Sequence, residues 1–388
     1  MTRPLNPVFA NRPMTIFAVM SALAKKHGAI NLGQGFPDED GPRALIEAAA
    51  RAIEKGPNQY APVQGAPELR KALARANRRF YGIEVDFETE TLVTAGATAA
   101  LAAAFLAFLQ PGDEAILFAP YYDTYAPMIE AVGAVPKIVP LQPPLWRIEQ
   151  AALASAVTSR TRVIAVNTPH NPTGRALTID ELKIIADVAI ANDLIVVCDE
   201  VYEHLIFDGA AHTPLMTFDG MRERCVRIGS AGKTFSMTGW RIGYATGPER
   251  LVTGMMKAHQ FFAYVCPPHL QLAVAKGLDF DDDYYAAFVK AMQEKRDLIM
   301  DGLKRAGFDV LPCEGTYFAS VDIGSVGGVD DVAFCKEITE KAGVTAVPVS
   351  AFYGAGDSLA PRRYARFCFC KKREVLEEAS RRLKAYFA

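Results

Sequence analysis

Four short motifs place reactive side chains directly after predicted buried strands. The most informative is the run from Ser230 to Arg241, which contains a hydroxyl, an amine at Lys233 and a guanidinium. A lysine that leaves the end of a buried strand between small residues is desolvated, and desolvation lowers the pKa of an amine so that it can act as a base or nucleophile. A lysine near glycines is more often a solvated loop residue. The other three motifs decide between these interpretations.

Two of these motifs supply polar groups that bind ligands. Ala97 and Thr98 open a predicted helix directly after a strand and Gly96, and free amides at a helix start bind anions. Asn171 lies between two prolines and before a glycine, which fix the backbone and aim its amide. A plain strand-to-helix connection and a structural turn are the alternative interpretations.

The last motif places Asp199 at the end of the apolar run 194–198, with Tyr202 three residues later. A carboxylate in that position is desolvated, and it therefore needs a cation, hydrogen-bond donors or a metal. A surface turn is the alternative interpretation, but the preceding apolar run argues against an exposed Asp199.

A nucleotide-binding P-loop is the main rival for Lys233, because Gly232-Lys233-Thr234 matches its last residues. That loop requires a glycine six positions before the lysine, so that enough amides surround the phosphates. Arg227 occupies this position, and the residues after Thr234 include a glycine, which is a poor start for the helix of a P-loop. We therefore reject this interpretation.

The elements that position these motifs follow from short β-branched runs that alternate with helical patterns. This alternation predicts parallel βαβ units, in which functional groups gather beyond the carboxyl ends of the strands. The predicted strands are 91–94, 115–118, 163–167, 194–198, 226–229 and 243–246, and the predicted helices between them include 97–109 and 178–191. Thr178 and Glu181 have the spacing of a capping box.

The pattern changes near residue 283. A long amphipathic helix is predicted over 284–306, followed by strands at 316–322, 344–347 and 363–370 and a helix over 374–387. We predict an α/β protein with a large domain (46–283) built on a mostly parallel sheet flanked by helices. A smaller α+β domain (284–388) follows it, and an N-terminal arm (1–45) packs with the small domain.

Composition restricts the class of protein. The chain has 388 residues, half of them apolar, and a net charge of −2 with both signs interspersed. No basic patch indicates nucleic acid, and no segment is long and apolar enough to predict a membrane span or a signal peptide. The seven cysteines form no CxxC pair, which indicates reduced thiols in a cytoplasmic protein and no metal site.

The four motifs together match the needs of one kind of cofactor, an aldehyde with a phosphate and a pyridine ring. Such a group needs a lysine for an imine, an anion site, a carboxylate that keeps the ring nitrogen protonated, and donors to the phenolic oxygen. Lys233 and Asp199 provide the first and third of these. The anion site is assigned to Ala97, Thr98, Ser230 and Arg241, and the phenolic-oxygen donors to Asn171 and Tyr202.

On these motifs the chain resembles the class I aminotransferases of the fold-type I pyridoxal-phosphate enzymes, over essentially its whole length. The resemblance extends to three further segments. It implies that Tyr60 reaches the phosphate of the partner subunit, that Tyr122 stacks on the cofactor, and that Arg366 binds the α-carboxylate of the substrate. An aspartate-aminotransferase-like fold and a homodimer with shared active sites are also implied.

The resemblance implies pyridoxal 5'-phosphate as cofactor and transfer of an amino group from an L-amino acid to a 2-oxo acid, in a ping-pong reaction through a Lys233 imine. Lys233, Asp199 and Tyr202 are the implied catalytic residues. Gly35 and Arg366, with Asn171, are implied to hold the substrate carboxylate.

The substrate is predicted to be aromatic, large and apolar, or sulfur-containing, because Phe36 and Tyr125 add aromatic rings to the expected pocket. The stretches 33–38, 122–125 and 367–369 resemble those of the kynurenine, glutamine and methionine transaminase subgroup. Tyr264-Val265 departs from the Phe-His pair common there, which leaves the fine specificity open. A C–S β-lyase and a dicarboxylate-preferring aminotransferase are the alternatives.

Overall fold

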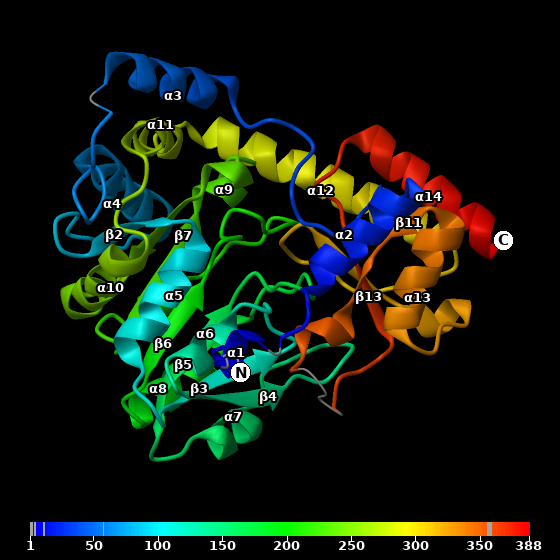
Figure 1. Cartoon of the computed structure of the whole chain (residues 1–388), viewed down its shortest axis with the longest axis horizontal. Coiled ribbons are helices and arrows are strands. Elements are labelled where there is room, and N and C mark those ends of the chain that lie inside the picture. The colour runs from blue at the N-terminus through cyan, green and yellow to red at the C-terminus, as the bar shows by residue number, and fades with distance from the viewer. Residues whose placement is uncertain (1–2, 4, 11, 57, 355–358) are drawn as a thin grey trace.

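The computed structural model describes residues 3, 5–10, 12–56, 58–354 and 359–388, and it contains a seven-stranded sheet, a four-stranded sheet and a two-stranded sheet (Figure 1). The strands of the large sheet lie in the order β2 (Thr91–Ala95), β8 (Ile242–Thr246), β7 (Cys225–Ser230), β6 (Ile195–Asp199), β5 (Thr161–Asn167), β3 (Glu114–Ala119) and β4 (Val135–Pro140). Only β8 runs antiparallel to its neighbours β2 and β7, and the other pairs are parallel.

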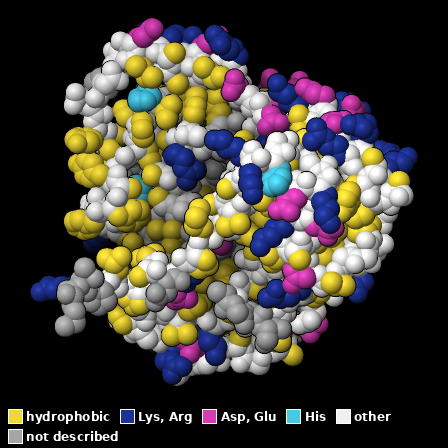
Figure 2. All heavy atoms as spheres, turned by 45° about the vertical axis from the view of Figure 1, so that its right-hand side comes forward, with side chains coloured by type: hydrophobic (Ala, Val, Ile, Leu, Met, Phe, Trp, Pro, Cys, Tyr) yellow, Lys and Arg dark blue, Asp and Glu magenta, His cyan; other side chains and the backbone are white. Residues whose placement is uncertain are grey.

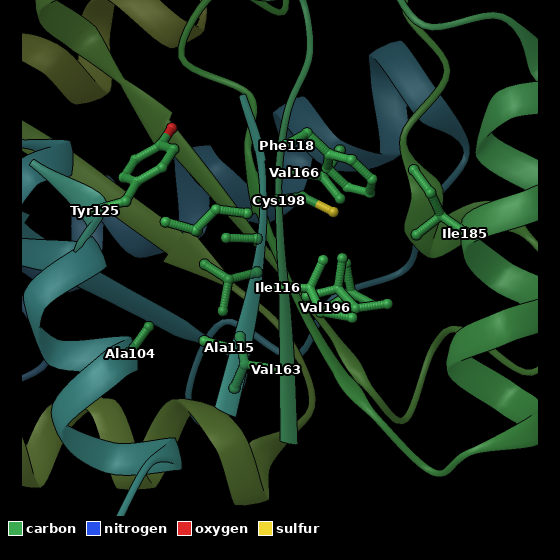
Figure 3. Packing of buried hydrophobic residues seen from close by; sticks show 14 of the residues in the cluster. Ala104, Ala115, Ile116, Phe118, Tyr125, Val163, Val166, Ile185, Val196 and Cys198 are labelled. Atoms are coloured by element: carbon green, nitrogen blue, oxygen red, sulfur yellow. The ribbon is translucent and has the colours of Figure 1, made fainter. Parts of the chain in front are cut away.

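The central strands are buried on both faces because helices cover both sides of the sheet, as is usual for parallel sheets. Figure 3 shows Ala104 and Tyr125 on one side of the strands and Phe118 and Ile185 on the other. The helices of this part of the chain are α3 (Arg43–Lys55), α4 (Pro67–Tyr81), α5 (Ala97–Phe108), α6 (Tyr125–Ala131), α7 (Gln150–Ala156), α8 (Ile179–Ala191), α9 (Ala231–Thr234), α10 (Glu249–Phe262) and α11 (Pro268–Leu278).

The smaller domain is built on an antiparallel sheet. Its strands lie in the order β12 (Val347–Pro348), β13 (Tyr364–Cys368), β10 (Phe318–Asp322) and β9 (Asp309–Val310). Its helices are α12 (Asp282–Arg305), α13 (Asp331–Glu337) and α14 (Arg373–Phe387), and short helical turns connect them. In Figure 1 the long helix α12 runs from the side of the large sheet to this domain.

The N-terminal segment lies against the smaller domain. It contains α1 (Pro7–Ala10), α2 (Ile16–His27) and β1 (Ile30–Asn31), and β1 pairs in parallel with β11 (Val344–Thr345). Helix α2 also contacts β11, and Figure 1 shows the two elements together. The chain after β1 therefore approaches the region between the seven-stranded and four-stranded sheets from the side of the small domain. The exact domain limits at residues 45 and 283 remain predictions.

Local patterns predicted six of the seven strands of the large sheet and the helices α5, α8, α12 and α14. The predicted capping box of α8 is present: the Thr178 hydroxyl accepts from the Glu181 amide, and the Glu181 carboxylate accepts from the Thr178 amide. The prediction missed β4, because Pro136 and Pro140 are unfavourable in a strand and are tolerated here at the edge of the sheet. The large sheet is mostly parallel, as predicted, and β8 is its antiparallel exception, since strand direction depends on the path of the connecting chain.

Among the described residues no helix has the length and apolar character to cross a membrane, and no group of His, Cys, Asp or Glu side chains is arranged to hold a metal ion.

Candidate active site

A cavity of about 510 Å³ opens beyond the carboxyl ends of the large sheet, between it and the smaller domain. It is lined by Phe17, Gln34, Gly35, Phe36, Ala97, Thr98, Leu101, Tyr122, Asn167, Asn171, Asp199, Val201, Tyr202, Ser230, Lys233, Thr238, Gly239, Arg241, Phe318 and Arg366. The four motifs predicted from the sequence thus meet in one place. Figure 2 shows a hollowed face of the molecule with lysine and arginine side chains around the hollow.

Lys233 enters the cavity from α9, a single helical turn that follows β7 directly. Burial lowers the pKa of its amine, while nearby cysteines and Asp199 act in the opposite direction. Its Nζ donates a hydrogen bond to the hydroxyl of Tyr317 at 2.5 Å. The amine is therefore partly desolvated and held at one point, as a nucleophile or base requires.

Asp199 ends strand β6 and is buried beneath the cavity. Its carboxylate accepts hydrogen bonds from the Tyr125 hydroxyl at 2.5 Å and from the Val201 amide at 3.3 Å. Burial raises the pKa of this carboxyl to about 6. Since both of these donors are neutral, a cationic group in the cavity would stabilise the ionised form.

The opposite end of the cavity suits an anion. Helix α5 begins there with Ala97 and Thr98, whose amides have no partners within the helix. Arg241 adopts a left-handed conformation with φ 54°, and a Cβ added to Gly96 would lie 2.5 Å from its Nη2 atom. The glycine therefore allows the guanidinium to approach the helix start closely, and the Ser230 hydroxyl lines the same cavity.

Arg366 is a buried cation on β13 whose hydrogen-bond partners are neutral. It donates to Asn171 Oδ1 at 2.6 Å and to the Gly33 carbonyl at 2.7 Å, and its Nε has no partner. Its guanidinium lies 3.8 Å from the centre of the Phe318 ring. Burial lowers its pKa to about 10. An incoming carboxylate would both neutralise this charge and satisfy Nε.

These observations fit pyridoxal phosphate. The start of α5 beside Arg241 would hold a phosphate, the Lys233 amine would hold the aldehyde, and the buried Asp199 carboxylate would pair with a protonated ring nitrogen. Arg366 remains available for a substrate carboxylate because its own partners are uncharged.

Two predicted site residues lie elsewhere. Tyr125 does not line the cavity: it is buried below it with its hydroxyl on Asp199, so the expectation of a substrate contact gives way to a supporting contact. Tyr60 is 78 % exposed and lies against Tyr264, with ring centroids 5.0 Å apart, outside the cavity of its own chain. The other predicted site residues, including Tyr122 and Phe36, line the cavity.

Sequence reasoning missed several contributors. Phe17 and Phe318 line the cavity although they come from α2 and from the small domain. Asn167 was predicted only as the end of a strand, yet its side chain donates to the Asp199 carbonyl at 2.9 Å and accepts from the Asn171 amide at 2.8 Å. An asparagine at the end of a buried strand was the available signal. Nothing in the local sequence marked Tyr317.

A buried ionic cluster lies behind the site. Arg227, the residue that argued against a P-loop, bonds Glu200 at 2.6 Å and Glu203 at 2.8 Å. Its guanidinium also packs 4.3 Å from the centre of the Tyr81 ring. Because Glu200 directly follows Asp199, this cluster holds the end of β6 from below.

The fold and the site define an aspartate-aminotransferase-like α/β enzyme of the fold-type I group. Residues 27–383 match the family described as "Aminotransferase class I and II". The chain belongs to this pyridoxal-phosphate-dependent family and is an aminotransferase.

Named relatives agree with this assignment. The chain is 47 % identical over 377 residues to a probable N-succinyldiaminopimelate aminotransferase of Mycobacterium tuberculosis, with 95 % of both chains covered. It is 41 % identical over 370 residues to the methionine aminotransferase of Escherichia coli, also with 95 % of both covered. The solved structure of the N-succinyldiaminopimelate aminotransferase from Mycobacterium tuberculosis superposes with a TM-score of 0.95, covering 99 % of this chain and 100 % of that one at 46 % identity.

Proposed function

We propose that this aminotransferase binds pyridoxal 5'-phosphate at Lys233 and takes the amino group of an L-amino acid whose side chain is uncharged, either aromatic, large and apolar, or sulfur-containing, for transfer to a 2-oxo acid. When bound, the cofactor supplies an aldehyde that reacts with amines and a ring that withdraws electrons from the substrate α-carbon. The buried, unneutralised guanidinium of Arg366 is the observation that carries the proposal, because it demands a carboxylate.

The residues at the reacting centre then have separate tasks. Lys233 is the amine that holds the cofactor and, once free, removes and returns the α-proton at Nζ. General acid–base transfer of this kind contributes about 10²- to 10⁴-fold. Asp199 keeps the ring nitrogen positively charged, a fixed electrostatic effect that Tyr125 supports from below. Asn171 and Tyr202 donate to the phenolic oxygen.

The remaining residues bind and orient. Phosphate binding is assigned to Ala97, Thr98, Ser230 and Arg241, and Tyr122 contacts the cofactor ring. Arg366 and the Gly35 segment hold the substrate carboxylate, with Asn171 bonded to the guanidinium at 2.6 Å. Phe36 faces the substrate side chain.

The charge of the cavity supports an uncharged substrate side chain. Within the described part of the chain its lining carries three cations, Lys233, Arg241 and Arg366. Cofactor attachment, phosphate and α-carboxylate use one each, so a second substrate carboxylate finds no cation in the same subunit. Phe17, Phe36 and Phe318 add apolar surface instead.

N-succinyldiaminopimelate is a second candidate, favoured by the 47 % identity to the mycobacterial relative. This compound has two carboxylates besides the one at its reacting centre. It would therefore need cations that the described lining of one subunit does not contain, and a partner subunit would have to supply them.

A substrate matrix tests these proposals. Methionine, phenylalanine, kynurenine, aspartate and N-succinyldiaminopimelate would each be paired with several 2-oxo acids, and the amino-acid products quantified. Preference for the first three supports the proposal, whereas preference for aspartate or the succinylated compound overturns it. Pyruvate formed from a cysteine conjugate without any 2-oxo acid would instead identify a β-lyase.

A homodimer with shared sites is part of the proposal. The exposed aromatic residues Tyr60, Phe261, Phe262 and Tyr264 support it, because clustered exposed aromatic rings are typical of interfaces. Figure 2 shows many hydrophobic side chains on one side of the hollowed face. We also propose a cytoplasmic location, which rests on the seven buried free thiols.

A further inference from the structure

Tyr317 connects the reactive amine to the substrate-binding segment. Its hydroxyl donates to the Gly35 carbonyl at 2.7 Å and receives a hydrogen bond from Lys233 Nζ at 2.5 Å. A phenol has a single proton to donate, and Gly35 accepts it. The Tyr317 oxygen is therefore oriented as an acceptor toward the lysine, whether Nζ is an amine or an ammonium.

The ring that carries this hydroxyl is fixed. Tyr317 is 1 % exposed, and its ring contacts those of Tyr202 and Phe318 edge-on, with centroids 5.2 and 4.8 Å apart. The backbone is held on both sides, because the Thr316 amide donates to Leu205 and the Tyr317 carbonyl accepts from Phe369. The Gly35 backbone packs so closely that a Cβ there would lie 2.8 Å from the ring.

A fixed acceptor orients the amine. Within the described residues, the bond to Tyr317 is the only hydrogen bond of Lys233 Nζ. When a neutral amine donates one N–H in a set direction, its lone pair occupies a different tetrahedral direction and stays available. When the amine is protonated, the same acceptor stabilises the ammonium ion.

The same contact links the amine to the carboxylate site. Gly35 accepts from Tyr317, and Gly33, two residues earlier, accepts from Arg366 Nη2 at 2.7 Å. One short segment therefore touches both the group that holds Lys233 and the group that binds the substrate carboxylate. The backbone of residues 33–35 therefore connects a carboxylate bound at Arg366 mechanically to the position of the Lys233 amine.

We propose that Tyr317 is a positioning residue for Lys233: its hydroxyl holds the free amine in place and ties it, through the Gly33–Gly35 segment, to the carboxylate site at Arg366. This proposal rests on the proposed role of Lys233 as the base that moves the α-proton. It adds to that role a fixed acceptor that sets both the direction and the proton affinity of the amine.

The first test uses the protein without cofactor. A Tyr317→Phe variant keeps the ring and removes only the hydroxyl. The pH dependence of the reaction of Lys233 with an amine-specific reagent would be measured, with a Lys233→Ala protein as background. We expect the midpoint to move to lower pH, because the ammonium ion loses its acceptor. A midpoint equal to that of the wild type would overturn the proposal.

Tyr285→Phe is the matched control. Its hydroxyl is buried too, but it bonds the Gly277 and Leu278 carbonyls at 3.4 Å, away from the cavity. We expect its midpoint to equal that of the wild type. A shift as large as that of Tyr317→Phe would show a general packing effect and would also overturn the proposal.

The loaded enzyme provides a second measurement. Misorientation of a base costs about tenfold to a hundredfold in rate, so kcat of Tyr317→Phe should fall by this factor while KM for the amino acid changes less. The isotope effect with α-deuterated substrate should rise, since proton transfer becomes slower relative to other steps. A fall in kcat without any rise in the isotope effect would contradict the assignment.

Failure of the proposed aminotransferase function can be distinguished from failure of the Tyr317 proposal. If the wild-type protein does not transaminate any amino acid, the proposed function fails, while the pH test on the unloaded protein still decides the contact. Should Tyr317→Phe not fold, a crystal structure of the unloaded wild type decides it. Nζ within hydrogen-bond distance of the Tyr317 oxygen supports the proposal, and a longer separation overturns it.

Discussion

Asp199 is a buried carboxylate whose charge two neutral groups, the Tyr125 hydroxyl and the Val201 amide, stabilise in the protein without cofactor. Burial nevertheless raises its pKa to about 6, above the value of about 3.9 usual for an unfolded chain. The folded state thus keeps a proton that the unfolded state loses between these values. The contribution to stability is present below about pH 4 and is lost as the pH rises through about 6.

An Asp199→Asn variant cannot titrate at this position. We therefore expect its free energy of unfolding, relative to the wild type without cofactor, to increase between about pH 4 and pH 7, by up to about 3 kcal/mol. Urea unfolding at several pH values measures this difference. Asp187→Asn, at an exposed site on α8, is the control. A difference between Asp199→Asn and wild type that is independent of pH would contradict the pKa assignment.

In the proposed carboxylate site, Arg366 would bind with a planar fork that a lysine cannot reproduce. Since its Nε is unpartnered and both terminal nitrogens are engaged, Arg366→Lys should raise KM for the amino acid by about 10- to 100-fold, the usual loss for a charged hydrogen bond. Arg363→Lys is the control, because its partner Asp322 lies outside the cavity. Equal KM values for the two variants would argue against a carboxylate site at Arg366.

At the scale of elements, the anion end depends on how closely β8 approaches the start of α5. A Cβ on Gly243 would lie 2.3 Å from the Gly96 carbonyl carbon and 2.4 Å from the Ala97 nitrogen, both backbone atoms. Gly243→Ala should separate the strand from the helix, cost about 1–3 kcal/mol of stability and weaken cofactor binding.

Absorbance titration with pyridoxal phosphate measures this loss of affinity. Gly254→Ala in α10 is the matched control: its Cβ would lie 3.5 Å from Ala107 Cβ, an ordinary contact, and alanine favours a helix. If Gly243→Ala binds the cofactor as tightly as Gly254→Ala, the close approach of β8 to the start of α5 is not needed for the anion site.

The ionic cluster behind β6 makes a different prediction. Arg227→Met removes the guanidinium that the buried carboxylates of Glu200 and Glu203 share, and should cost about 3–5 kcal/mol in urea unfolding. Arg224→Met breaks the pair with Asp193, whose side chain is 95 % exposed, and should cost about 1 kcal/mol or less. Similar losses for both variants would show that burial of the cluster contributes nothing.

At the scale of the whole molecule, shared sites predict complementation between subunits. In a hybrid of Lys233→Ala and Tyr60→Phe chains, one site combines an intact Lys233 with an intact Tyr60. If the proposed dimer exchanges subunits, a mixture should regain up to about a quarter of wild-type activity, because half of the dimers are hybrids with one intact site of two.

The control for this experiment mixes Lys233→Ala with Asp199→Asn. Both residues belong to the same cavity of one chain, so no hybrid contains an intact site. Shared sites would be refuted if the first mixture were no more active than the control. They would also be refuted if light scattering showed a monomer and that monomer had full activity.

The sequence alone determined the chemical groups and all but one strand of the large sheet. Residues such as Lys233, Asp199 and Asn171 were recognisable because each comes shortly after an apolar run that predicts a buried strand. The predicted helices followed from apolar periodicity and capping residues. Each of these patterns spans only a few residues. The motifs nevertheless meet in the folded protein, because parallel strands bring their carboxyl ends to one edge of the sheet.

Only the tertiary structure decided which side chains support those groups. Tyr125 was predicted to contact substrate, yet it holds Asp199 from 74 positions away. Tyr317 meets Lys233 from a distance of 84 positions and Gly35 from 282, and no local pattern records such a contact. The edge strand β4 and the reversed direction of β8 were likewise set by the path of the chain. Contacts between distant segments depend on how layers pack, and that information is spread over the whole sequence.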